Sequence, residues 1–176
     1  GSVADASSMA RIFANTNLAA AGGVVVALIL GQFLYKKVDL TFVLNGALGG
    51  LVSITAEPLT PTFLSAILIG GIGGGLVILT IPLLDKLKID DVVGAIPVHL
   101  VCGIWGTLAV PITNDGASFS AQLIGIISIG AFVLISSFIL WFTVKALLGV
   151  RLSDSEEKDG ADKSEIGLSS YPEFIQ

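Results

Sequence analysis

Five stretches of almost uninterrupted apolar residues dominate this sequence. A bilayer core of roughly 30 Å takes about 20 helical residues to cross. Only 13% of the 176 residues are charged, whereas soluble domains carry about 25%. The pattern therefore predicts an all-α, polytopic membrane helix bundle. Its five transmembrane helices are expected near residues 6–34, 40–56, 63–84, 92–112 and 119–148.

The lengths of these segments differ. The second is short for a complete span, whereas the last has about 30 residues and would reach about 45 Å, so we expect it to tilt or project. The polar residues that follow predict a separate tail. We expect a transmembrane bundle over residues 1–152 and a cytoplasmic tail over 153–176, which either docks on the bundle or is disordered.

Basic residues gather on one side of the predicted bundle. Of the nine Lys and Arg residues, all except Arg11 share that side if the spans alternate. Cytoplasmic loops are enriched in Lys and Arg. We therefore expect a multi-pass protein of the cell membrane with Ser2 outside and the tail in the cytoplasm.

His99 is the only histidine, and it lies inside the fourth apolar segment. An ionisable side chain at membrane depth indicates a functional site. Asp90 and Asp91 precede the segment and are expected to cap its helix as structural residues. Pro97 is expected to kink that helix, with His99 about eight residues and about 12 Å along it.

Small residues surround His99 at helical spacing: Ala95, Gly103 and Gly106 are predicted to share its face. Either another helix packs against this face or the face lines a narrow path. In a path, a neutral imidazole offers one donor and one acceptor. It can replace part of the hydration of a small neutral or cationic solute, or pass a proton.

Other polar and small residues indicate packing. Asn15, Thr16 and Asn17 are more readily explained as hydrogen-bonding links between helices than as ligands. Three GxxxG pairs, at 46–50, 70–74 and 71–75, predict close helix contacts. Cys102 is a lone cysteine, and no metal-binding, phosphate-binding or Ser/His/Asp motif occurs. We therefore expect no enzyme activity, no metal, no cofactor and no nucleic-acid partner.

Five segments occur in a fixed order along the chain: NTNLAAAGG at 15–23, NGALGGLVSITA at 45–56, DDVVGAIPVHLVCGIWG at 90–106, GAD at 160–162 and SYPEF at 170–174. In this order they closely resemble ammonium transporters of the Amt family. The resemblance implies an eleven-helix fold assembled as a homotrimer with one pore per subunit. This chain would supply the last five helices, and the long fifth segment would be the tilted eleventh helix. Residue 1 is glycine, so we expect a fragment or a processed product.

The resemblance also assigns site residues. His99 matches the second of two pore histidines, and Ser2 matches a serine of the outer substrate site, although a Gly-Ser pair is also a common cloning remnant. The first pore histidine and the outer aromatic residues belong to the upstream part of the family sequence. Gly94 and Leu100 depart from the family pattern, which often has Asp and Gly there, and Ile166–Gly167–Leu168 replace its usual His-Gly-Glu.

The implied function is transport of ammonium or ammonia across the lipid bilayer. The cation would be recruited outside near Ser2 and lose its proton before or within the apolar section, and ammonia would pass His99. The alternatives are an ammonium sensor that signals through its tail and an Rh-type channel for ammonia or carbon dioxide. A PII signalling protein would dock on the tail and on the loop 86–91.

Overall fold

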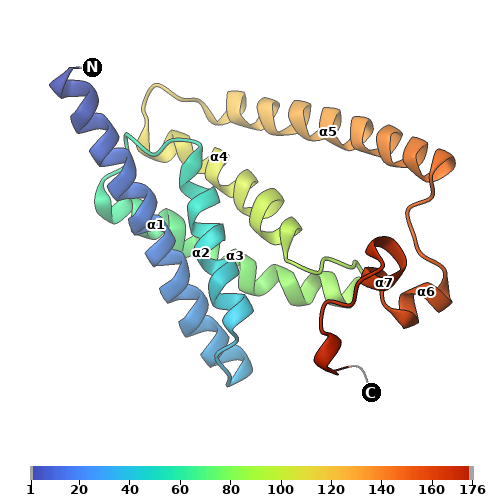
Figure 1. The fold of residues 1–176 in the computed structure, drawn as a ribbon. Coiled ribbons are helices and arrows are strands. Elements are labelled where there is room, and N and C mark those ends of the chain that lie inside the picture. The colour runs from blue at the N-terminus through green and yellow to red at the C-terminus, as the bar shows by residue number, and fades with distance from the viewer. Residues whose placement is uncertain (1, 175–176) are drawn as a thin grey trace. The chain divides into compact units, whose positions relative to one another are not determined.

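The computed structural model describes residues 2–174, so Gly1 of the predicted Gly1–Ser2 pair and the last two tail residues lie outside the described part. Every regular element in that part is helical, in agreement with the predicted all-α class (Figure 1). The membrane-type elements are α1 (Val3–Tyr35), α2 (Leu40–Thr55), α3 (Phe63–Lys86), the π-helix η1 (Ile96–Val101), α4 (Cys102–Thr113) and α5 (Phe119–Leu147). The tail forms α6 (Asp154–Asp159), α7 (Ala161–Ile166) and the 3₁₀ turn η2 (Pro172–Phe174).

Within residues 2–174, four helical stretches are long and apolar enough to cross a membrane: α1, α3, η1 with α4, and α5. The predicted second span appears as α2, which has only 16 residues and is shorter than a usual span. The count of five spans therefore stays a prediction.

The fourth predicted span begins later than expected. Val92 and Val93 form a turn, and the π-helix starts at Ile96. Pro97 lies in the first helical turn, where its missing N–H costs no hydrogen bond, so the predicted kink is wrong. His99 is accordingly the fourth residue of η1 rather than the eighth of a longer helix.

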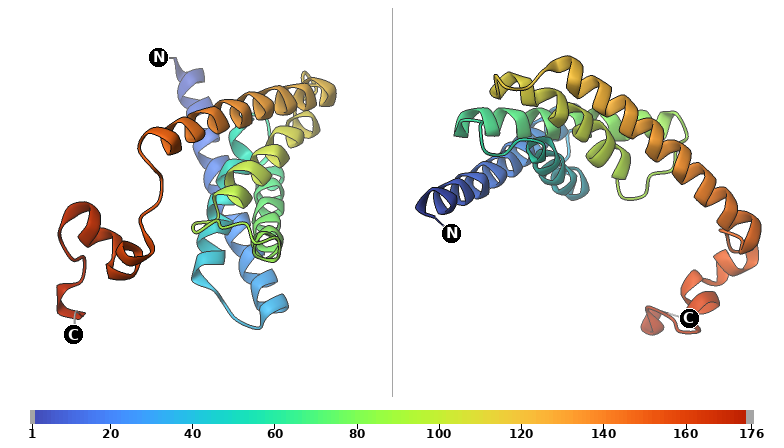
Figure 2. Two further views of the ribbon diagram at one scale, coloured as in Figure 1. Left: turned by 90° about the vertical axis from the view of Figure 1, so that its right-hand side faces the viewer. Right: turned by 90° about the horizontal axis from the view of Figure 1, so that it is seen from above.

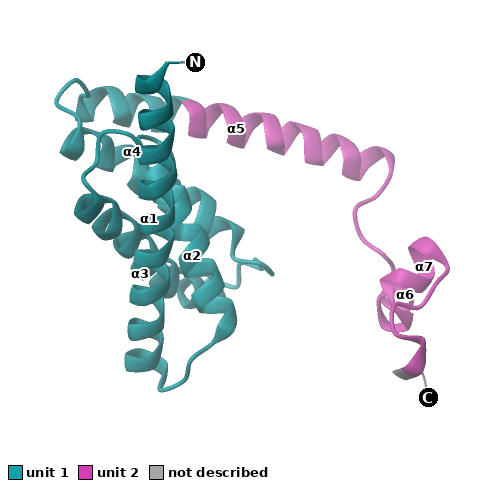
Figure 3. Cartoon of the chain, turned by 60° about the vertical axis from the view of Figure 1, so that its left-hand side comes forward, with its two compact units in different colours: residues 1–128 teal, residues 129–176 magenta. Residues whose placement is uncertain are grey.

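The described chain falls into two compact units, residues 1–128 and 129–176, and the boundary lies within α5 (Figure 3). No residue of α5 is buried. In the first unit, α1 packs along both α2 and α3, and α2 packs along α3 and α4 (Figures 1 and 2).

Glycines bring α1 into backbone contact with both neighbours. A Cβ added to Gly50 of α2, or to Gly70 of α3, would collide with the same carbonyl oxygen, that of Ala19. One turn along α1, a Cβ on Gly74 would collide with the carbonyl oxygen of Gly23. Only glycine permits helices to approach this closely.

The three predicted GxxxG pairs are thus not equivalent. Gly46 and Gly50 both face the backbone of α1, as do Gly70 and Gly74, so close packing is confirmed for these two pairs. In the third pair, a Cβ on Gly75 would meet only side chains of α1, at 3.5 Å or more.

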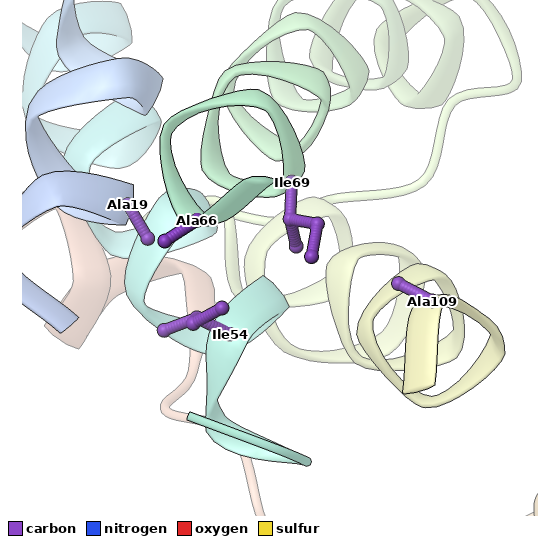
Figure 4. Close-up of a cluster of buried hydrophobic side chains, with 5 residues drawn as sticks. All are labelled: Ala19, Ile54, Ala66, Ile69 and Ala109. Carbon is purple, nitrogen blue, oxygen red and sulfur yellow. The ribbon is translucent and has the colours of Figure 1, made fainter. Parts of the chain in front are cut away.

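The core between these helices consists of small and branched residues. Figure 4 shows one cluster, to which α1, α2, α3 and α4 all contribute: Ala19, Ile54, Ala66, Ile69 and Ala109. A second cluster joins α3 to the π-helix and α4 through Val77, Val98 and Cys102. Trp105 adds a hydrogen bond from its Nε1 to the carbonyl oxygen of Ile69, at 3.0 Å.

The tail, which belongs to the second unit, is locally ordered. The backbone N–H of Ser170 donates to Oδ2 of Asp162 at 2.6 Å, and this bond holds the pKa of Asp162 below its ordinary value. The hydrogen bond from Ser170 to Asp162 connects the SYPEF motif to the GAD motif. Ile166 and Leu168 are exposed, and docking of the tail on the bundle stays a prediction.

Replacement of Gly70 by Ala should destabilise the bundle by about 1–3 kcal/mol, because the added methyl must displace the backbone of α1. Gly75→Ala, in the same helix, should be neutral or slightly stabilising, because the site has room and alanine favours helix. Thermal unfolding of the purified protein that contains this chain measures both. Equal melting temperatures for the two variants would contradict this account of the packing.

Candidate functional site

The helix that carries His99 begins on the carboxylate of Asp91. The backbone N–H of Ala95 donates to Oδ1 of Asp91, and that of Ile96 donates to Oδ2, both at 2.8 Å. The first N–H groups of a helix lack partners within it. A single side chain therefore satisfies two of them.

Gly94 and Pro97 account for the remaining donors of this first turn. Pro97 has no N–H, and the N–H of Val98 donates to the carbonyl oxygen of Gly94 at 3.1 Å. Gly94 has a φ of +75°, which a residue with a side chain rarely adopts. A Cβ there would also lie 2.9 Å from Nδ2 of Asn45, a buried residue of α2. Both the backbone conformation and the lack of space therefore require glycine at position 94, in the turn before η1.

The far end of the π-helix is anchored in the core. The N–H of Cys102 donates to the carbonyl oxygens of both Pro97 and His99, where the π-helix passes into α4. Cys102 is fully buried, and its Sγ lies 3.4 Å from the carbonyl oxygen of Gly73 in α3. Short π-helical stretches occur frequently at functional sites.

His99 lies on the exposed side of this element, next to Leu100. The opposite side packs on the bundle through Val98, Cys102 and Gly106. A Cβ on Gly106 would collide with the backbone of Ser53, so the predicted placement of Gly106 on the face of His99 is wrong. The prediction assumed α-helical periodicity throughout, and the i→i+5 bonds of a π-helix change it.

Of the other predicted site residues, Ser2 belongs to a helix that does not contact η1, whereas Asp90 and Asp91 directly precede the helix of His99. Ser2 is the N-cap of α1: its Oγ accepts from the N–H of Asp5 at 3.1 Å, and the carboxylate of Asp5 accepts from the N–H of Ser2 at 2.8 Å. Asp90 is exposed and makes no side-chain hydrogen bond within residues 2–174, so Asp91 alone caps the His99 helix. The helices α1 and η1 are not in contact.

Asn15 holds an extended loop rather than a second helix. Its Nδ2 donates to the carbonyl oxygens of Pro58 and Pro61, both at 2.9 Å, and the residue is fully buried. Arg11, one turn away, donates to Pro61 as well, at 3.2 Å. Asn15 therefore links α1 to another part of the chain, but its partner is a loop and not the predicted second helix.

The two neighbours of Asn15 behave differently. Thr16 and Asn17 donate to carbonyl oxygens of their own helix, those of Ile12 and Phe13, at 2.8 Å. Within residues 2–174 they link no other element, so for these two residues the linking role stays a prediction.

An apolar groove of about 570 Å³ lies between α1 and α3, with Gly71 and Gly75 on one wall. It exposes no polar surface and does not include His99. Such a groove suits hydrocarbon rather than a polar solute, so its chemistry does not favour it as the functional site.

The long apolar helices and the glycine-mediated packing define a multi-pass α-helical membrane protein. The chain belongs to the Ammonium Transporter Family, whose sequence profile matches residues 1–171. This agrees with the resemblance seen in the sequence motifs.

Three relatives illustrate the similarity. The "Putative ammonium transporter sll1017" of Synechocystis sp. is 44% identical over 160 residues, covering 89% of this chain and 36% of the relative. "Ammonium transporter Amt2" of Archaeoglobus fulgidus is 36% identical over 184 residues, covering 93% of this chain and 39% of the relative. A solved structure named "Sensor Amt Protein" matches with a TM-score of 0.84 at 32% identity, covering 94% of this chain and 43% of that chain. The chain thus spans little more than a third of the length of these two transporters.

Asn15→Leu should destabilise the protein by about 1–3 kcal/mol, because the half-buried carbonyl of Pro58 loses this donor and the buried carbonyl of Pro61 keeps only Arg11, while the side-chain volume is nearly kept. The same change at the exposed Asn17 should cost about 0.5 kcal/mol or less. Thermal unfolding compares the two. A larger loss at position 17 would overturn the role given to Asn15.

Proposed function

We propose that the protein containing this chain transports ammonium or ammonia across the cell membrane through a narrow pore lined by His99. The observation that carries the proposal is the placement of the chain's only histidine. It lies on the open face of a π-helix fixed at both ends, within a chain of the ammonium transporter family. Two relatives bear ammonium transport in their names.

The mechanism follows from the cost of charge in hydrocarbon. A bare ammonium ion is expensive at membrane depth, whereas ammonia is neutral and small. The cation therefore gives up its proton before or within the apolar section. The imidazole of His99 then replaces part of the hydration of ammonia through one donor and one acceptor.

The outer site would include Ser2. Its hydroxyl oxygen already accepts one bond from the N–H of Asp5, and a hydroxyl has a second acceptor position that an N–H of ammonium can use. The carboxylate of Asp5 adds negative charge beside it. Both groups are exposed at the first turn of α1, so a cation can reach them.

The remaining architecture rests on the family resemblance. The complete protein would have eleven transmembrane helices and form a homotrimer, with the tail in the cytoplasm. The tail and the loop 86–91 would offer the docking surface for a PII signalling protein. The uneven distribution of Lys and Arg supports this orientation.

A second function, ammonium sensing, is favoured by one specific observation. The matched solved structure is named as a sensor, and its fold agrees with this chain at a TM-score of 0.84. In that case ammonium binding would change the tail rather than, or in addition to, moving solute. A transport-dead variant that keeps ammonium-dependent signalling would favour the sensor.

His99→Ala and His99→Asp in the full-length protein should lower methylammonium uptake by about tenfold or more, because the solute loses a hydration-replacing partner. Uptake by proteoliposomes measures this effect. Thr55→Val is a control, because the exposed Thr55 hydroxyl binds only Leu51 of its own helix. Wild-type uptake and selectivity in both His99 variants would disprove the assigned role.

A further inference from the structure

We infer that Asp91 is a positioning residue for His99: its carboxylate fixes the start of the π-helix and thereby the direction of the imidazole. The inference rests on the proposed function, since the direction of His99 matters only if the ring meets the solute. It goes beyond helix capping, because it assigns Asp91 an effect on transport that acts through one other residue.

The hydrogen bonds of the first turn depend on Asp91. Asp91 accepts from Ala95 and Ile96, and Pro97 has no donor. Asp91 therefore supplies every side-chain acceptor that the first turn uses. Without it, two N–H groups at the beginning of the helix lose their protein partner: that of the exposed Ala95 and that of the half-buried Ile96.

These two bonds also set the register of the helix that follows. They reach four and five residues forward from Asp91, a span that the turn at Gly94 makes possible. The π-helix that follows is a rare element, which local bonding must maintain against the ordinary α-helix. An α-helix turns by about 100° per residue, so a change of register at the free end would swing a side chain by tens of degrees.

The residues on either side of His99 pack in the core. Val98, directly before it, and Cys102, three residues after it, are buried. His99 is the first exposed residue of the π-helix, so a change of register that begins at Asp91 would leave these two neighbours packed and would alter the exposed side chain between them. The imidazole is the polar group most directly affected by the loss of Asp91.

Asp90 provides a matched control. It is the same residue type one position earlier, it is exposed, and it makes no side-chain hydrogen bond within the described chain. Removal of either carboxylate changes the local charge equally. A difference between the two positions therefore reports the hydrogen bonds rather than the charge.

The experiment uses the full-length protein in proteoliposomes, with methylammonium flux and selectivity over potassium measured per folded protein. Asp91→Ala should lower flux about tenfold or alter selectivity, because a small misplacement of a functional group has effects of this size or larger. Asp91→Asn, which keeps one carbonyl acceptor, should retain more activity, and it replaces the Ala variant if that variant does not fold. Asp90→Ala should stay within about twofold of the wild type.

A double-mutant cycle separates positioning from a general structural role. If Asp91 acts through His99, the Asp91→Ala/His99→Ala protein should transport as much as His99→Ala alone. A further loss in the double variant, or unchanged transport by both Asp91 variants while His99→Ala is impaired, overturns the inference and leaves the proposed function intact. Unchanged transport by His99→Ala overturns the proposed function, and the inference with it.

Discussion

The structure depends on the close approach of α1 to two other helices at once. The carbonyl oxygens of Ala19 and Gly23 lie where glycines of α2 and α3 leave no room for a side chain. In a membrane, lipid tails are as apolar as leucine, so burial of apolar surface contributes little to helix association. Van der Waals contact at short range must supply the attraction, and small residues make it possible. The GxxxG pairs at 46–50 and 70–74 therefore provide the close contacts that hold α1, α2 and α3 together.

Similar close contacts hold η1 and α4, the helices of the candidate site, against α2 and α3. Gly106 of α4 touches the backbone of Ser53 in α2, and Cys102 packs with Val77 in α3. With that side of η1 and α4 fixed, His99 faces outward from the packed helices. At the start of η1, the carboxylate of Asp91 binds the first two N–H groups of the helix. The helix that carries the histidine is thus held by glycine contacts on one side and by a carboxylate at its end, while His99 on its other side is exposed.

The sequence predicted the helical class, most helix boundaries and the importance of the glycines, because apolar length and GxxxG spacing act locally. It missed the π-helix, since the assumed period of 3.6 residues placed Gly106 with His99 and Pro97 at a kink. The spacing of Asp91, Gly94 and Pro97 was the available signal for a later start. It also missed the loop partner of Asn15, because a contact 43 residues away leaves no trace in local pattern. Whether Ser2 serves an outer site depends on chemistry that periodicity does not describe.

The central claim is that His99 faces a conduction path. A high-resolution cryo-electron microscopy map of the full-length protein in lipid nanodiscs tests it most directly. The account predicts that the imidazole points into a narrow passage enclosed by further helices, with η1 still π-helical and Asp91 still bonded to Ala95 and Ile96. An imidazole that faces lipid, or one enclosed by packed side chains with no passage beside it, would contradict the account.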